Sequence, residues 1–123
     1  MKHTAVLAAL TAIAAAVVIA RPAAAQPASA TSVVHLSALS SGLRFNTTTL
    51  HAKAGRIKIL FANHSALNHN VRIEKGENEL GGTKTIGTGS TSAIVTLKKG
   101  TYNFYCSVPG HEDAGMHGTL IVS

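Results

Sequence analysis

The chain is organised around one stretch, Thr101-Tyr-Asn-Phe-Tyr-Cys-Ser-Val-Pro-Gly-His-Glu-Asp-Ala-Gly-Met-His-Gly-Thr-Leu120. Its cysteine, Cys106, is the only one in the sequence, and it is followed at two equal gaps by His111 and then Met116. Proline and glycine in Val108-Pro-Gly110 predict a reversal of the chain after the cysteine. Three side chains with thiol, imidazole and thioether donors are therefore expected to converge on one small ion.

The donor types narrow the choice of ion. Soft cysteine and methionine ligands beside a borderline histidine suit copper in both oxidation states. A trigonal set of two histidines and one cysteine, with a long axial methionine, is the blue-copper arrangement. The stretch supplies only one histidine, so another part of the chain has to provide the second.

Short runs typical of β-strands fill the chain after residue 32, and no helical period is present there. About seven or eight strands, with turn signals roughly every ten residues, predict an all-β sandwich of about 100 residues. The region Lys75–Ser90 is too broken for a long helix and is expected to be a surface excursion. The expected strands cover Ser32–Leu39, Leu43–Leu50, Arg56–Asn63, His69–Glu74, Thr91–Leu97, Thr101–Cys106 and Gly118–Val122.

Strand parity connects this fold to the donors. Alternate residues of a strand share a face, so Cys106 points inward with Tyr102 and Phe104. By the same rule His69 shares its face with two aliphatic residues, and Met116 extends an apolar strand. A polar donor on an apolar face is costly unless something pairs with it. A metal ion would pair with all of them.

The N-terminus has the features of a secretory signal peptide over residues 1–25. Lys2 precedes an apolar run from Ala5 to Ala20, and small residues end at Ala25. We expect cleavage after Ala25, or else after Ala30, and an extracytoplasmic, periplasmic location. The alternative is an uncleaved membrane anchor, but the apolar run is shorter than the roughly 20 residues that span a bilayer.

A flexible lead-in is expected over residues 26–32, and the folded domain over 33–123. Residues 26–123 contain nine Lys and Arg against five Asp and Glu, mostly scattered. Nucleic-acid binding would need a basic stripe with stacking rings, so this class is disfavoured. A mild positive charge fits weak steering toward an acidic partner protein better.

A single cysteine is unusual in a small exported domain, which commonly has an even number paired in disulfides. Cys106 is therefore either buried and inert or a metal ligand, and its neighbours favour a ligand. Structural zinc seldom recruits methionine, and a dinuclear copper centre would need a second cysteine. A Cys–His nucleophile pair would lack a third orienting group and a substrate cleft.

The choice of the second histidine follows from position. His117 directly follows Met116, so alternation sends it to the opposite face. His64 lies in the loop before His69 and could reach a metal, but its spacing matches no site that these residues could form, so a weak role for it stays open. His69 and His111 remain as ligands. The histidines expected at the surface or outside the site are His35, His51, His64 and His117.

These residues resemble the cupredoxins, the small blue copper proteins. The resemblance rests on Asn63 followed by His69-Asn-Val71, and on the stretch Tyr105–Gly118; together they make a strong signal. The Cys–His gap is azurin- or auracyanin-like, whereas the His–Met gap is plastocyanin-like, so the subfamily stays open. Weaker matches lie at Gly42–Phe45, Ala52–Gly55 and Gly100–Cys106.

The resemblance implies a Greek-key β-sandwich or barrel and one type 1 copper ion. It makes His69, Cys106 and His111 the equatorial ligands and Met116 the weak axial ligand. Two further roles follow from the same resemblance. Asn70 would brace the cysteine loop through hydrogen bonds near Ser107, and the carbonyl of Asn68 could approach the open axial side.

The expected function is one-electron transfer between extracytoplasmic redox partners, with no enzymatic activity. Partners would be transient redox proteins, such as a cytochrome or an oxidase or reductase. The protein is expected to be a monomer that is not attached to a membrane once the leader is cleaved. The His111 imidazole edge is expected to meet solvent through an apolar rim of Leu67, Val108, Pro109 and Ala114. The alternative is a copper carrier that delivers metal to an apo-oxidase.

Overall fold

The computed structural model describes residues 15–22 and 31–123. The first of these segments has no regular secondary structure, and the second forms the β-domain. Both predicted cleavage sites, after Ala25 and Ala30, lie outside the described residues, as do most of the predicted leader and lead-in. Within the described residues, no helix is long and apolar enough to cross a membrane.

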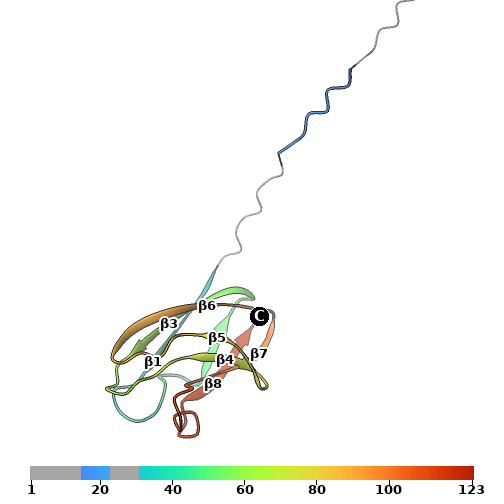
Figure 1. Cartoon of the computed structure of the whole chain (residues 1–123). Helices are drawn as coiled ribbons and strands as arrows, with labels where there is room; N and C mark the ends of the chain where they lie inside the picture. Colours follow the sequence, from blue (N-terminus) through green and yellow to red (C-terminus); the bar gives the residue numbers. More distant parts are fainter. Residues whose placement is uncertain (1–14, 23–30) are drawn as a thin grey trace, which may run out of the picture.

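The predicted all-β sandwich is confirmed. Residues 31–123 form two sheets, one with the strand order β1-β3-β6 and the other with the order β2-β8-β7-β4-β5. The sheets face one another across a single core (Figure 1). The strands of the described residues are β1 (Ser32–Ala38), β2 (Thr49–Ala52), β3 (Gly55–Asn63), β4 (Arg72–Lys75), β5 (Asn78–Gly82), β6 (Gly89–Leu97), β7 (Gly100–Tyr105) and β8 (His117–Val122).

The alternation read from the sequence matches the buried faces. In β3, Ile57, Ile59 and Phe61 are each at most 1% exposed, and their neighbours along the strand face outward. Burying each of these side chains contributes about 1.5–3 kcal/mol. In β7 the same rule buries Tyr102 and Phe104, so the strand that leads to Cys106 is anchored in the core.

The strand predicted over Leu43–Leu50 is wrong for most of its length, because β2 begins only at Thr49. Phe45 is nevertheless buried, in an isolated bridge to β1. The side chain of Asn46 accepts a hydrogen bond from the Ser37 N–H at 2.8 Å. Because an asparagine side chain takes the place of a backbone partner there, the segment is a loop pinned to β1.

The region Lys75–Ser90 is not only a surface excursion, since it contains β5 and the first two residues of β6. β5 forms an antiparallel hairpin with β4. It lies at the edge of its sheet and its first three residues are exposed. A strand without a buried face shows no apolar alternation, and this explains why no sequence pattern revealed it.

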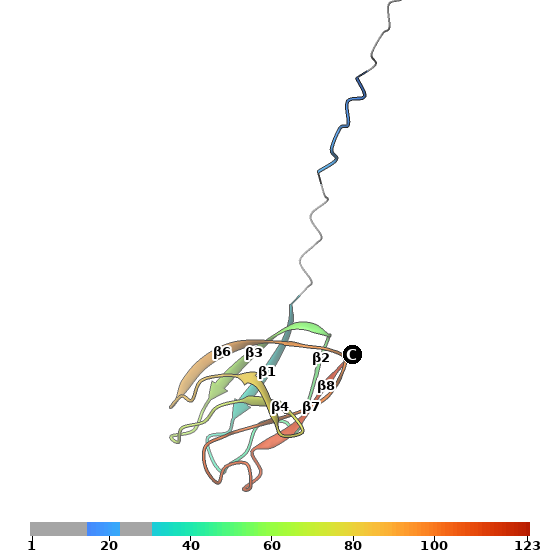
Figure 2. The same cartoon turned by 45° about the vertical axis from the view of Figure 1, so that its right-hand side comes forward.

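The strand register places the predicted donors at one end of the sandwich. β1 and β3 run in parallel and both end there, with Ala38 paired to Asn63. β7 also ends there at Tyr105, and β8 starts there at His117. Figure 2 shows the red loop between β7 and β8 at the end opposite to the start of β1.

Gly118 offers a test of packing near this end. A Cβ atom at this position would collide with the Phe104 ring and the Thr48 carbonyl oxygen. Gly118→Ala should lower the free energy of unfolding by about 1–3 kcal/mol, as overpacking does. The matched control is Gly87→Ala, whose Cβ would lie 3.5 Å from its nearest neighbour. Urea unfolding measures both, and equal stability of the two variants would contradict the close approach.

Candidate metal centre

The loop between β7 and β8 is closed by its own backbone. The Cys106 N–H donates to the Met116 carbonyl at 3.0 Å, and the Met116 N–H donates to the His111 carbonyl at 3.0 Å. The turn after the cysteine is closed by the His111 N–H, which donates to the Val108 carbonyl at 3.0 Å. Three predicted donors are therefore fixed relative to one another by bonds that involve none of their donor atoms.

His69 reaches the same place from the other part of the sheet. β4 pairs with β7 so that Arg72 lies opposite Tyr105, and the residues before β4 therefore meet those after β7. The predicted strand His69–Glu74 starts only at Arg72, but His69 forms an isolated bridge with Ile86. Backbone hydrogen bonds of 3.0 and 2.9 Å join these two residues, and they hold His69 in the interior.

Three donor atoms converge. The Nδ1 atoms of His69 and His111 are 3.1 Å apart, and they lie 3.8 and 3.6 Å from Cys106 Sγ, respectively. Metal–nitrogen and metal–sulfur bonds of about 2.0 and 2.3 Å, spread over a plane, require donor separations of about 3.5–3.7 Å. The observed separations are close to these values. The donor set and its spacing fit one ion in a trigonal site.

Met116 is the fourth predicted donor, and it is fully buried within the core. Its backbone bonds to Cys106 and His111 hold it at the closed end of the loop. Together with the three converging donors, it completes the residue set of a type 1 copper site. The four histidines expected outside the site are exposed and do not belong to this cluster: His35, His51, His64 and His117.

Burial differs among the donors. Cys106 and His69 are fully buried, whereas His111 is partly exposed. Burial lowers the pKa of His69, and the nearby His111 lowers it further. The fold thus favours the neutral imidazole, which is the form that binds metal ions.

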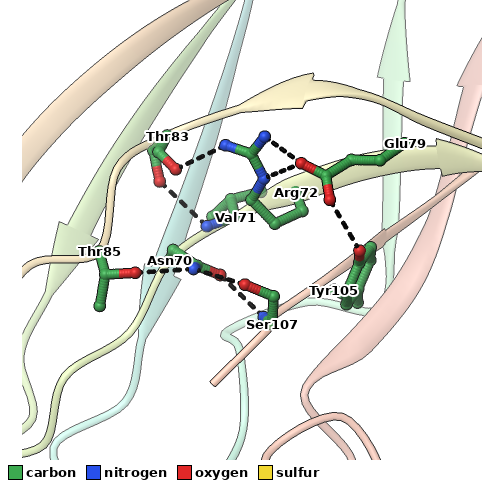
Figure 3. Close-up of polar contacts among 8 residues, drawn as sticks. All are labelled: Asn70, Val71, Arg72, Glu79, Thr83, Thr85, Tyr105 and Ser107. Atoms are coloured by element: carbon green, nitrogen blue, oxygen red, sulfur yellow. Dashed lines mark hydrogen bonds and ion pairs between the residues drawn. The ribbon is translucent and has the colours of Figure 1, made fainter. Parts of the chain in front are cut away.

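Asn70 links the two halves of the site, as predicted. Its Oδ1 accepts a hydrogen bond from the Ser107 N–H at 2.8 Å, and its Nδ2 donates to Ser107 Oγ at 2.8 Å. Nδ2 also donates to Thr85 Oγ1 at 2.9 Å. Figure 3 shows Asn70 between Thr85 and Ser107. The residue after Cys106 is therefore joined to the residue after His69.

Thr83 and Thr85 support this link, although sequence reasoning did not single them out. Thr83 is 1% exposed; its N–H donates to the Val71 carbonyl at 2.8 Å and its Oγ1 accepts from the Val71 N–H at 3.0 Å. The close approach needs Gly82, since a Cβ there would collide with the same Val71 carbonyl. In the sequence, the adjacent glycines Gly81 and Gly82 before Thr83 could have indicated this close approach.

The predicted apolar rim is on the surface to different extents. Leu67 is 53% exposed, Pro109 and Ala114 are exposed, and Val108 is half-buried. Val108 also packs against the hydrophobic core. These residues lie in the loops that carry the donors.

The lowered pKa of His69 predicts a pH dependence of the metal-free protein. An unfolded histidine binds its proton near pH 6.5, so below that pH the unfolded state binds more protons than the folded state. The free energy of unfolding should therefore fall as the pH drops from about 6.5 toward the lowered pKa. His69→Gln should flatten this slope and the exposed control His51→Gln should keep it, as measured by denaturant unfolding across pH. If the slope were unchanged in His69→Gln, the lowered pKa of His69 would not be the cause of the pH dependence.

Comparisons with known proteins identify the family of the chain. A family model described as copper binding proteins, plastocyanin/azurin family, matches residues 32–123. The plastocyanin of Solanum crispum is 33% identical over 92 residues, which cover 67% of this chain and 90% of that protein. The chloroplastic plastocyanin of Pisum sativum is 34% identical over 100 residues, but these cover only 58% of its length and 73% of this chain.

Solved structures lead to the same family. Dithionite-reduced auracyanin from Roseiflexus castenholzii matches with a TM-score of 0.69 at 25% identity, over 74% of this chain and 96% of that structure. Auracyanin B matches with a TM-score of 0.70 at 25% identity, over 80% of this chain and 92% of that structure. The chain is a cupredoxin and belongs to the plastocyanin/azurin family of copper binding proteins.

Proposed function

We propose that His69, Cys106, His111 and Met116 bind one copper ion as a type 1 centre, and that the protein carries single electrons. The observation that carries the proposal is the convergence of three donor atoms, from two separate segments, within 3.8 Å of one another. Copper bound there would supply one-electron chemistry, because this ligand set accepts both of its oxidation states. The expected role is that of a carrier, not an enzyme.

Rigidity of the donor frame supports electron transfer. The frame is held by backbone bonds and by Asn70, and none of these contacts uses a donor atom of the four ligands. A frame that is fixed without the metal need not rearrange when the charge of the ion changes. The dithionite-reduced form of the related auracyanin is a precedent within the family for a change of redox state.

Exposure of the donors suggests the route of the electron. Only His111 is partly exposed, whereas the other three proposed ligands are fully buried. A partner would therefore contact the His111 edge and the surrounding rim, where the Leu67 side chain is 53% exposed. Small contacts of this kind suit transient redox partners.

The apolar leader in the sequence favours an extracytoplasmic location, and we propose that the carrier acts there as a monomer.

Delivery of copper to an apo-oxidase is the competing function. Buried donors and a single methionine in the folded domain favour electron transfer over metal release. An optical and EPR spectrum of the copper-loaded protein, followed by voltammetry, tests the proposal. A thiolate-to-copper visible band and a reversible redox wave are expected. Absence of both, with copper passing readily to an apo acceptor, would establish the carrier function instead.

Two substitutions separate the proposed ligand roles. Cys106→Ser should abolish the visible band, because it removes the thiolate. Met116→Gln should keep copper bound but lower the reduction potential, since the axial ligand tunes the potential. His117→Gln is the matched control next to Met116 and should leave both properties unchanged. Loss of copper in Met116→Gln as severe as in Cys106→Ser would contradict a weak axial role.

A further inference from the structure

The two ring nitrogens of His69 have different surroundings. Nδ1 faces the proposed metal position, 3.1 Å from His111 Nδ1 and 3.8 Å from Cys106 Sγ. Nε2 lies on the other side of the ring, 3.2 Å from the hydroxyl oxygen of Ser65. Because His69 is fully buried, this hydroxyl takes the place that solvent has for an exposed imidazole.

Ser65 is itself held firmly. It is 5% exposed, and its N–H donates to Asn63 Oδ1 at 2.9 Å. Its carbonyl accepts a hydrogen bond from Thr88 Oγ1 at 2.7 Å, and its Oγ accepts one from the Leu67 N–H at 2.9 Å. The backbone and the hydroxyl of Ser65 are therefore fixed by three separate contacts.

Asn63 stabilises the same loop through its side-chain amide. It is 1% exposed, and its Nδ2 donates to the Leu67 carbonyl at 2.8 Å and to the Ile86 carbonyl at 3.1 Å. Ile86 is also the backbone partner of His69. The loop that carries Ser65 is thus joined by hydrogen bonds to the segment that positions His69.

We propose that Ser65 is a positioning residue for the metal centre, whose hydroxyl accepts a hydrogen bond from the Nε2–H of His69 and directs the Nδ1 lone pair at the ion. The inference rests on the proposed function, because His69 is a ligand there. A partner on the second ring nitrogen fixes both the tautomer and the orientation of a ligating histidine. Here a side-chain hydroxyl fills that role.

The surrounding groups can satisfy this tautomer, and metal binding at Nδ1 requires it. A serine hydroxyl has two acceptor positions and one proton; Leu67 N–H occupies one acceptor position, and Nε2–H can take the other. On the other side of the ring, His111 and Cys106 can each donate to the unprotonated Nδ1 of His69. The opposite tautomer would place a proton on Nδ1, where the metal has to bind.

The experiment uses the metal-free, ¹⁵N-labelled protein under conditions where the imidazole is neutral. Long-range ¹H–¹⁵N correlation spectra report which nitrogen of His69 carries the proton, and solvent exchange reports how well that proton is protected. The wild type should show Nε2–H in slow exchange. A His69 protonated on Nδ1 in the wild type would overturn the proposal, whatever the variants do.

Variants of Ser65 test the hydroxyl itself. Ser65→Ala should speed exchange of the Nε2 proton, mix the tautomers and weaken copper binding by about 10–100-fold. Ser65→Thr keeps the hydroxyl and should restore the wild-type spectrum, and Ser92→Ala is the exposed control in β6. Wild-type tautomer, exchange and copper affinity in Ser65→Ala would overturn the proposal.

Failure of Ser65→Ala to fold and failure of the proposed function can each be distinguished from failure of the Ser65 proposal. If Ser65→Ala does not fold, the tautomer of the wild type and the spectrum of Ser65→Thr still decide. If the copper-loaded wild type lacks a type 1 spectrum, the proposed function fails, whereas the metal-free spectra continue to report on the hydrogen bond between Ser65 and His69.

Discussion

The antiparallel pairing of β4 with β7 is the interaction on which the metal centre depends. Arg72 lies opposite Tyr105, so the chain before β4 and the chain after β7 meet at one end of the sheet. Since side chains alternate, a slip of one residue would turn every side chain of β4 to the other face. β4 also pairs with β5 on its other side, and the Arg72 side chain is ion-paired with Glu79 there. The register that brings His69 to Cys106 is therefore fixed from both sides.

This register creates an energetic difficulty that the surrounding bonds have to offset. It places a thiol and an imidazole at fully buried positions, where polar groups are costly unless they are paired. The structure pairs the Nε2 of His69 with the Ser65 hydroxyl and holds the cysteine loop through Asn70. Hydrogen bonds within the protein thus stabilise the donor arrangement, so its geometry does not depend on a bound ion alone.

The strands and the convergence of the donor residues could be predicted where the signal was local or periodic. Cys106, His111 and Met116 lie in one short stretch, and His69 follows from alternation with Val71. Prediction failed where a side chain replaces a strand partner, as Asn46 does for Ser37. It also missed β5, because an exposed edge strand has no apolar period. It missed Thr85, because a long-range hydroxyl contact leaves no pattern in the sequence, and it missed Thr83, for which the adjacent glycines Gly81 and Gly82 were the one indirect sign.

The unequal burial of the two histidines divides their duties under the proposed function. His69 is enclosed, bonded through Ser65 and tied to Ile86, so it can hold the ion but cannot meet a partner. His111 is partly exposed, and the next two residues, Glu112 and Asp113, are exposed acids. The positive charge of the folded domain must then lie elsewhere on its surface. Steering by net charge and docking at His111 are therefore separate contributions: the first acts at a distance and falls with salt, while the second depends on the apolar rim and on local acidic side chains.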